Sequence, residues 1–397
     1  MNIVTSKYNN KIITWIIALI AASFLLSLVV LQVLTAILFF LWLSESFESK
    51  KKAFGKIEIA FTIFAFFRLF SVAISSFPEL SIHSLYKDAL FYLSLYAFSF
   101  YIKVLSIENL KKILSTFFNA SVIVALIGIV IFNLGIKDRA TSIVSGYATF
   151  STFLLTSVAI SFFSYDKDSL EKNKYFWAVR VGLILTAIVV ALGRADLGIA
   201  VLVFIAGSIF FRPSIVQIVI ALAIVFSLSF ISFKNNSSQL AHRIEKPATM
   251  SDRDVLWGTV FERAHEHPFF GFGPRTFKGV FNHTDQLGDK EVGGWHNDYL
   301  VIYIESGVFA LLSYLSLIAI IYFMSAKKLL GKESNCSDKN TIFVFLLAVS
   351  GMFLSSFLSG VIADPINSIV LSFVLSGLSA YVFKADLAKK TLEEQTA

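Results

Sequence analysis

Apolar segments long enough to cross a lipid bilayer follow one another along almost the whole chain. Hydrophobic residues make up 56% of the 397 residues and charged residues only 15%, where soluble domains carry about 25% charged residues. Backbone groups inside a bilayer must satisfy their own hydrogen bonds, so such segments fold as helices. The sequence predicts an all-α polytopic membrane protein, with residues 1–397 forming a single membrane domain.

Hydropathy predicts twelve transmembrane helices. They are expected near residues 12–28, 30–45, 57–77, 89–106, 110–134, 146–165, 175–192, 196–211, 213–233, 297–325, 341–361 and 366–384. The first two are the least distinct, because residues 12–43 form one unbroken apolar stretch that could also be a single long tilted helix. One long polar loop, residues 234–296, separates the ninth helix from the tenth.

Basic residues are distributed unevenly between alternate connectors. One set of connectors holds most of the lysines, among them Lys7, Lys11, Lys50, Lys51, Lys52, Lys56, Lys103, Lys111, Lys112 and the group at 327–339. The short connectors of the other set hold Lys87, Lys137, Arg139 and Arg194. The positive-inside rule then places both termini in the cytoplasm and the 234–296 loop outside it. This asymmetry explains most of the net charge of +7 without a nucleic acid partner.

Few residues are suited to metal or redox chemistry. Cys336 is the only cysteine, so the chain cannot form an internal disulfide or a site with several thiolates. The His265-Glu266-His267 run, with His242 and His283 in the same loop, invites a metal hypothesis, but its spacing points the two rings to different faces of a helix. No nucleotide-binding motif is present either. We therefore expect no metal and no cofactor.

The polar loop contains an expected amphipathic helix that begins near Arg253. Free backbone N–H groups and the dipole of its first turn favour a phosphate, and Arg253 lies there. The later Gly271-Phe272-Gly273-Pro274 run predicts a turn that positions the loop, with Arg275 as an additional candidate contact to substrate.

His296 stands where the polar loop meets the tenth apolar helix. Asn297 or Asp298 can serve as the N-cap of that helix. A neutral imidazole at this boundary can accept a proton from a hydroxyl group. The alternative is an interfacial side chain that anchors the helix beside Trp295 and Tyr299.

Three arginines are predicted on the same outer side as His296: Arg139, Arg194 and Arg253. Arg194 could instead pair with Asp196 or a lipid phosphate, but the planar guanidinium suits bidentate binding of a diphosphate. Arg68, within an apolar segment, is functional or buried against a partner. Asp364 is either a partner for one of the arginines or the cap of the last helix.

Together these motifs resemble the bacterial O-antigen ligase family. The resemblance rests on the Arg194 turn, the Arg253 helix with Trp257, the Gly271 to Pro274 turn, and the run from His296 to Leu300 followed by Glu305-Ser306-Gly307. It implies a glycosyltransferase C-like membrane enzyme in the bacterial inner membrane with a periplasmic active site. In that family two arginines and one histidine are essential, and they match Arg194, Arg253 and His296.

The implied reaction moves a polysaccharide from undecaprenyl diphosphate to the lipid A core, with inversion and without a metal. Arg139, Arg275, Asn297 and Asp298 would then contribute to substrate binding. An O-antigen or exopolysaccharide polymerase, which uses the same glycan donor with another glycan as acceptor, is the alternative. A further alternative is a transporter of polysaccharide or lipid-linked glycan. The functional polar residues of a transporter should lie near the bilayer midplane, whereas the candidates here lie at one surface.

Overall fold

The computed structural model describes residues 5–165, 175–235, 253–283, 286–287, 293–331 and 336–396. Every regular element within these ranges is a helix, as the sequence predicted. The N-terminal part contains α1 (Asn10–Ser23), α2 (Leu28–Leu43), α3 (Phe47–Ala53), α4 (Lys56–Ala73), α5 (Pro78–Lys87), α6 (Ala89–Val104), α7 (Ile107–Asn133) and α8 (Tyr147–Ser161), extended by the 3-10 turn η1 (Phe162–Ser164).

The remaining helices follow after η1. They are α10 (Phe176–Val190), α11 (Arg194–Phe211), α12 (Ile215–Asn235), α14 (Arg253–Arg263), the 3-10 turn η2 (Ala264–Glu266), α15 (Phe277–Val280), α16 (Asp298–Leu330), α17 (Cys336–Ser355) and α18 (Asn367–Thr396). The 234–296 loop therefore contains α14 and α15, while its residues 236–252 lie outside the described ranges.

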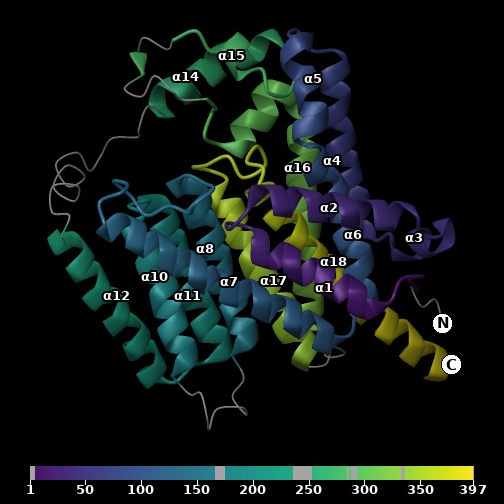
Figure 1. Ribbon diagram of the computed structural model, residues 1–397. Coiled ribbons are helices and arrows are strands. Elements are labelled where there is room, and N and C mark those ends of the chain that lie inside the picture. The colour runs from purple at the N-terminus through teal and green to yellow at the C-terminus, as the bar shows by residue number, and fades with distance from the viewer. Residues whose placement is uncertain are drawn as a thin grey trace.

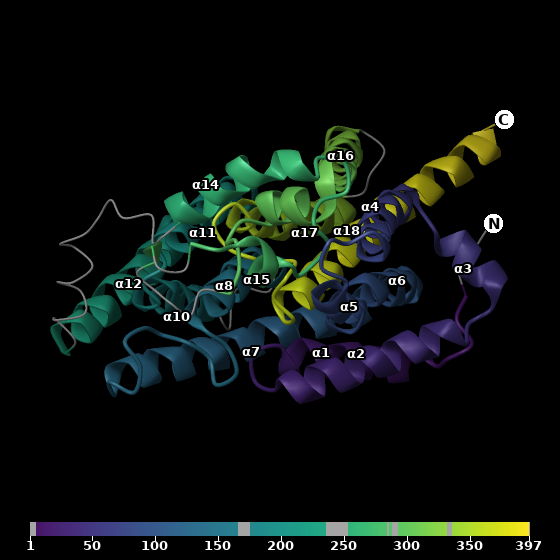
Figure 2. The same cartoon turned by 90° about the horizontal axis from the view of Figure 1, so that it is seen from above.

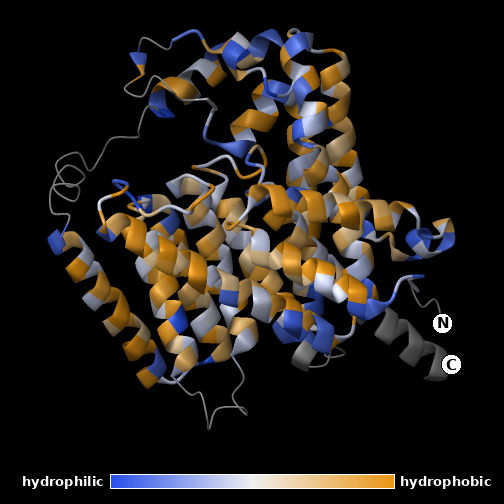
Figure 3. Ribbon diagram, in the orientation of Figure 1, coloured by the Kyte–Doolittle hydropathy of each residue, from blue (hydrophilic) through white to orange (hydrophobic). Residues whose placement is uncertain are grey.

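Fewer helices meet the length and hydropathy expected of a membrane span than the twelve that the sequence predicted. In the described ranges seven helices are long and apolar enough to span a membrane, or eight if α2 and α3, bent by 110°, count as one. Two more apolar helices, α1 and α10, are shorter. Each of the twelve expected segments coincides with a helix, but twelve crossings are not confirmed. The helices are those of a multi-pass membrane protein, and apolar residues predominate along most of the bundle helices in the ribbon of Figure 3.

The first apolar stretch forms two helices. A turn over residues 24–27 separates α1 from α2, and the Ser27 hydroxyl caps α2 by accepting a hydrogen bond from the Val30 amide. The two helices pack against each other. A single long helix over residues 12–43 is therefore excluded.

Helix α18 forms the centre of the bundle. Of its residues 367–384, 89% are buried, and the helix packs against α6 and α17. Helix α12, by contrast, is 22% buried over its apolar window and packs at the periphery against α10. Both chain ends lie at the same end of the molecule in the two views of Figures 1 and 2.

Helices α14 and α15 form a layer over one end of the bundle with a small core of their own. Leu256, Val260 and Trp295 are among the buried residues of this core, which packs against the first turns of α16. In Figure 1 the connector between α17 and α18 lies between this layer and the bundle. Residues 253–283 of the polar loop thus pack above the helix ends.

Helix α16 is interrupted at Gly307, whose φ of 73° is not helical. The Gly271 to Gly273 segment inserts at this break: the Phe272 and Gly273 amides donate hydrogen bonds to the carbonyls of Ile304 and Glu305, at 2.9 and 2.8 Å. Carbonyl groups released by the break thereby gain partners, as buried backbone requires. The turn that the sequence predicted is thus the part that fastens the loop to the bundle.

Candidate active site

Arg253 reaches from the first turn of α14 to the connector between α17 and α18. Its Nη2 donates a hydrogen bond of 2.7 Å to the carbonyl oxygen of Leu358. The contact fixes where the positive charge of Arg253 lies.

Arg194 begins α11 directly after Gly193, and it is exposed. Two residues later, the buried Asp196 accepts a 2.8 Å hydrogen bond from the hydroxyl of Ser355, the last residue of α17. The charge of Arg253 also interacts with Asp196. The Arg194 turn is thus held against the same connector that Arg253 contacts.

His296 is exposed between two buried neighbours. Trp295 is 1% exposed, and its carbonyl accepts a hydrogen bond from the Trp257 indole at 3.3 Å. Asn297 caps α16 by accepting from the Leu300 amide at 3.1 Å, which resolves the choice of N-cap. His296 itself has a φ of 51°, a left-handed conformation that costs a non-glycine residue roughly 1–2 kcal/mol. The packing on both sides offsets this strain and directs the imidazole outward.

Asp298 holds the connector from the other side. Its side chain is fully buried, and Oδ2 accepts hydrogen bonds from the Ser356 hydroxyl at 2.8 Å and from the Val361 and Ile362 amides at 2.9 and 3.1 Å. The Asp298 amide in turn donates to the Ser356 carbonyl at 2.9 Å. Through these bonds the Asp298 side chain positions the backbone of the connector. Direct contact of Asp298 with substrate stays a prediction.

Residues 355–362, the clamp segment, therefore join the three predicted catalytic positions. Ser355 binds the turn of Arg194, Leu358 binds Arg253, and Val361 with Ile362 binds the helix start that carries His296. In Figure 1 this segment runs beneath α14. Sequence reasoning missed this segment, because small residues such as Ser355, Ser356, Ser359 and Gly360 do not distinguish it from an ordinary connector between helices.

Arg139 lies beside the turn that precedes Arg194. Its guanidinium stacks over the Tyr147 ring, 3.9 Å from the centroid, and the adjacent Ala140 amide donates to the Val190 carbonyl at 3.0 Å. Arg139 thus lies near the end of α10 that leads to the Arg194 turn. Its role in substrate binding is not tested by these contacts.

Arg275 is engaged with the bundle. It forms an ion pair with the carboxylate of Asp88, including a 3.0 Å bond from Nε, and its Nη2 lies 3.3 Å from the carbonyl oxygen of Ala363. About a quarter of the side chain stays exposed. These contacts favour an anchoring role for the turn, while substrate binding by Arg275 stays a prediction.

Arg68 has the buried partner that an intramembrane charge requires. Both terminal nitrogens lie 3.2 Å from Oε2 of Glu305, and Nη1 also donates to the Ser306 hydroxyl at 3.0 Å. Arg68 and Glu305 are 4% and 6% exposed. The pair lies directly before the break in α16, so it supports the position of the inserted turn.

Asp364 caps the last helix. Its Oδ1 accepts from the Ile366 and Asn367 amides at 3.0 and 2.7 Å, and its Oδ2 accepts from the Thr149 hydroxyl at 2.7 Å. Burial raises the pKa of the Asp364 carboxyl. Of the two roles that the sequence left open, the helix cap is the one observed.

The histidines of the polar loop do not come together in the part of the chain described. His267 packs against the Phe272 ring and lies 3.2 Å from the Ser76 hydroxyl, and His242 lies outside the described residues. Within the described ranges no three potential metal ligands of the His, Cys, Asp or Glu type form a group.

Comparison with known proteins connects this site to a family. No curated protein matches the chain. A family model described as O-antigen ligase matches residues 179–315, which include α11, α14, the inserted turn and the first half of α16. Arg194, Arg253 and His296 all fall within the matched region. Over these residues the chain is similar to the O-antigen ligase family.

Proposed function

We propose that this protein is an O-antigen ligase that transfers a polysaccharide from undecaprenyl diphosphate to the lipid A core at the periplasmic face of the inner membrane. The family supports glycan transfer of the ligase or polymerase type. The observation that carries the proposal is the clamp segment, residues 355–362, to which the turn of Arg194, the Arg253 side chain and the helix start behind His296 are all bound.

In this mechanism the arginines act on the leaving group. The acceptor hydroxyl attacks the anomeric carbon of the glycan, the bond from that carbon to the phosphate oxygen breaks, and undecaprenyl diphosphate leaves with the bonding electrons. Negative charge grows on the diphosphate as this happens. Arg194 and Arg253 stabilise it, and since their positions are fixed beforehand they favour the transition state over the ground state. Arg139 and Arg275 are proposed to extend this positive surface.

His296 acts on the acceptor. Its exposed imidazole accepts the hydroxyl proton as the new glycosidic bond forms, which keeps the attacking oxygen neutral or partly negative. One displacement at the anomeric carbon inverts its configuration. The reaction needs no nucleotide, because the donor already holds the glycan through a bond from the anomeric carbon to a good leaving group, the carrier diphosphate. We propose that it also needs no metal.

A transfer assay with purified protein tests the proposal. Wild-type protein should join lipid-linked polysaccharide to lipid A core in the presence of EDTA. His296→Ala should lower kcat by about 10²–10⁴-fold, and Arg194→Ala or Arg253→Ala by roughly 10²–10³-fold. Full loss of activity with EDTA would overturn the metal-free mechanism, and normal activity of His296→Ala would overturn the assignment of the base.

The alternative, a polymerase, uses the same arginines and histidine but a carrier-linked glycan as acceptor. Deletion of the gene separates the two functions. Loss of all long chains from the lipid A core, with carrier-linked polymer accumulating, indicates a ligase. A core that bears a single repeat indicates a polymerase.

A further inference from the structure

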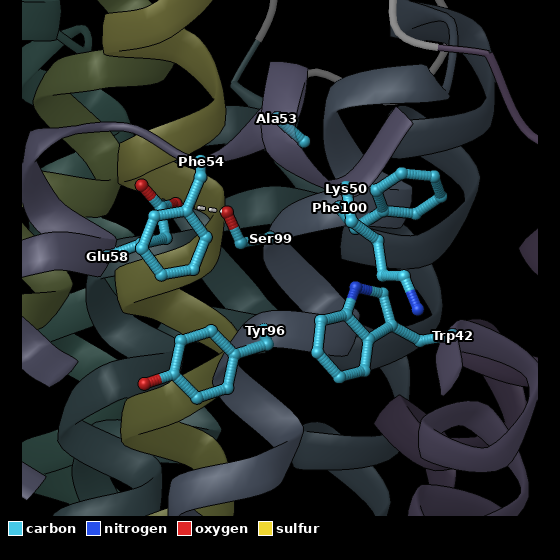
Figure 4. Close-up of a pocket in the computed structure, with 8 residues that line it drawn as sticks. All are labelled: Trp42, Lys50, Ala53, Phe54, Glu58, Tyr96, Ser99 and Phe100. Atoms are coloured by element: carbon cyan, nitrogen blue, oxygen red, sulfur yellow. Dashed lines mark hydrogen bonds between the residues drawn. The ribbon is translucent and has the colours of Figure 1, made fainter. Parts of the chain in front are cut away.

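A second surface of the chain combines lysines with a wall of aromatic rings, at the bend between α2 and α3. The two helices meet at 110° over residues 44–46. Around this bend lies a small recess, lined by Trp42, Lys50, Ala53, Phe54, Glu58, Tyr96, Ser99 and Phe100 and drawn in Figure 4. We call it the elbow site. None of its residues belongs to the family match or to the candidate active site.

Four rings from three elements form the wall of the elbow site. Phe39 stacks on Trp42, Trp42 on Tyr96, and Tyr96 on Phe54, with centroid distances of 5.6, 5.9 and 5.8 Å. Figure 4 shows the rings of Tyr96 and Phe54 side by side near the recess. Aromatic side chains of this kind favour the boundary between the headgroups and the hydrocarbon of a bilayer.

A cation stands at one end of the wall. The ammonium group of Lys50 lies 5.1 Å from the centroid of the Trp42 ring and donates a 2.9 Å hydrogen bond to the Leu43 carbonyl. That bond uses one of its three hydrogens. Lys51 is exposed beside it. The backbone amide of Lys7 donates to Glu45, so a further lysine lies close to the bend.

The elbow is held at both ends. At the end of α2, the Ser6 hydroxyl donates to Glu45 at 2.5 Å, and the hydroxyls of Tyr8 and Ser44 lie 2.6 Å apart. At the end of α3, Lys103 donates to the Ala53 carbonyl at 2.6 Å.

The carboxylates of the region have partners of their own. Glu58 pairs with the buried Lys103 at 2.7 Å, and Glu48 lies 3.7 Å from Lys52. Glu45 accepts hydrogen bonds from the Ser6 hydroxyl and the Lys7 amide, so its charge offsets one lysine. With Lys50 and Lys51 the preorganised surface keeps a net positive charge, and preorganisation reduces the entropy lost when a ligand binds.

We propose that the elbow site binds one anionic phospholipid, with the phosphate on Lys50 and Lys51 and the glycerol and upper acyl chain along the wall from Trp42 to Phe54. A run of lysines alone would attract anionic lipid only diffusely. The ring wall supplies the apolar contact that a headgroup site needs beside its cations, and the fixed bend places the two together. Inorganic phosphate lacks the acyl chain that the ring wall would contact. A zwitterionic lipid has no net negative charge, because its headgroup cation offsets its phosphate and is repelled by the lysines, so an acidic phospholipid fits better.

Native mass spectrometry of the full-length protein tests this with phosphatidylglycerol and phosphatidylcholine. Wild-type protein should retain more phosphatidylglycerol than phosphatidylcholine, and inorganic phosphate should not displace the phosphatidylglycerol. Lys50→Ala with Lys51→Ala should weaken that binding by roughly fivefold for each lysine removed. The matched control, Lys111→Ala with Lys112→Ala, removes two exposed lysines from the second turn of α7, away from the elbow's ring wall, and should bind as wild type.

Trp42 supplies a second measurement at the site itself. The fluorescence of Trp42 is the difference between the emission of wild type and that of Trp42→Phe. Phosphatidylglycerol brominated in its upper acyl chain should quench this fluorescence, and phosphatidylcholine brominated at the same position should quench it less. Unchanged binding by the Lys50 and Lys51 variant, or equal quenching by the two lipids, would overturn the proposal. Equal loss of binding in the Lys111 and Lys112 control would also overturn it, since diffuse attraction would then suffice.

Discussion

Arg68 and Glu305 form an ion pair, 3.2 Å long, across the buried interface between α4 and α16. Ser306 and Ser71 extend it through hydroxyl groups, with Ser71 donating to Ser306 at 2.8 Å. The pair adjoins the break at Gly307, where the turn from Gly271 to Gly273 is inserted. A charge pair in the bundle therefore supports the loop that carries Arg253 and His296.

Removal of one partner should destabilise the protein strongly. Glu305→Ala leaves the Arg68 charge buried without its carboxylate, which costs about 3–5 kcal/mol in comparable sites. The free energy of unfolding, measured by SDS titration in micelles, checks this. The double variant Arg68→Met, Glu305→Leu removes both charges and should be more stable than Glu305→Ala. A loss below about 1 kcal/mol in the single variant would show that the pair contributes little.

The two glycines at the inserted turn should not tolerate a side chain. A Cβ on Gly307 would lie 2.1 Å from the Phe269 carbonyl carbon, and one on Gly271 would lie 2.3 Å from that of Glu305. Both residues also have positive φ, so alanine adds backbone strain of about 1–3 kcal/mol. Gly307→Ala and Gly271→Ala should each lower the midpoint of thermal unfolding. Gly258→Ala, in α14 with open space around it, is the control and should not.

Hydropathy predicted the helices well, because each apolar segment must form its own backbone hydrogen bonds. The start of α16 was foreseen to within one residue, since a side-chain cap is a local signal: the sequence left Asn297 and Asp298 as candidates, and Asn297 is the cap. Arg68 and Glu305, however, are 237 positions apart, and no local pattern identifies such a partner.

The clamp segment was missed for a related reason. Its contacts to Asp196 and Asp298 are made by hydroxyl groups and backbone amides, which have no distinctive sequence. Arginines and a histidine could be recognised as candidates by their chemistry. What brings them together is backbone from a connector outside the matched residues 179–315.

Asp364 should make stability depend on pH. Burial raises the pKa of its carboxyl, so the folded state favours the protonated form. Its contribution to stability is therefore present at low pH and is lost as pH rises through the raised pKa. Asp364→Asn is neutral at every pH, so the difference in unfolding midpoint, Asp364→Asn minus wild type, should grow as pH rises above the ordinary aspartate pKa of about 3.9. Asp254→Asn, at an exposed carboxylate of α14, should show no comparable trend. If the unfolding midpoint of Asp364→Asn fell relative to wild type as pH rises, the raised pKa of the Asp364 carboxyl would be contradicted.

Asp298 should act on the rate of transfer through the position of His296, if the proposed reaction is correct. Asp298→Ala removes the acceptor of three hydrogen bonds from Ser356, Val361 and Ile362, so the helix start behind His296 loses its hold on the clamp segment. Misplacement by about 1 Å costs on the order of 100-fold in rate, so kcat should fall by roughly that factor while KM for the lipid-linked glycan changes little. Ser356→Ala, which removes one of the three bonds, should give a smaller fall in the same direction. If His296→Ala is inactive but Asp298→Ala keeps the kcat of wild type, His296 remains the catalytic base and the positioning role of Asp298 is disproved.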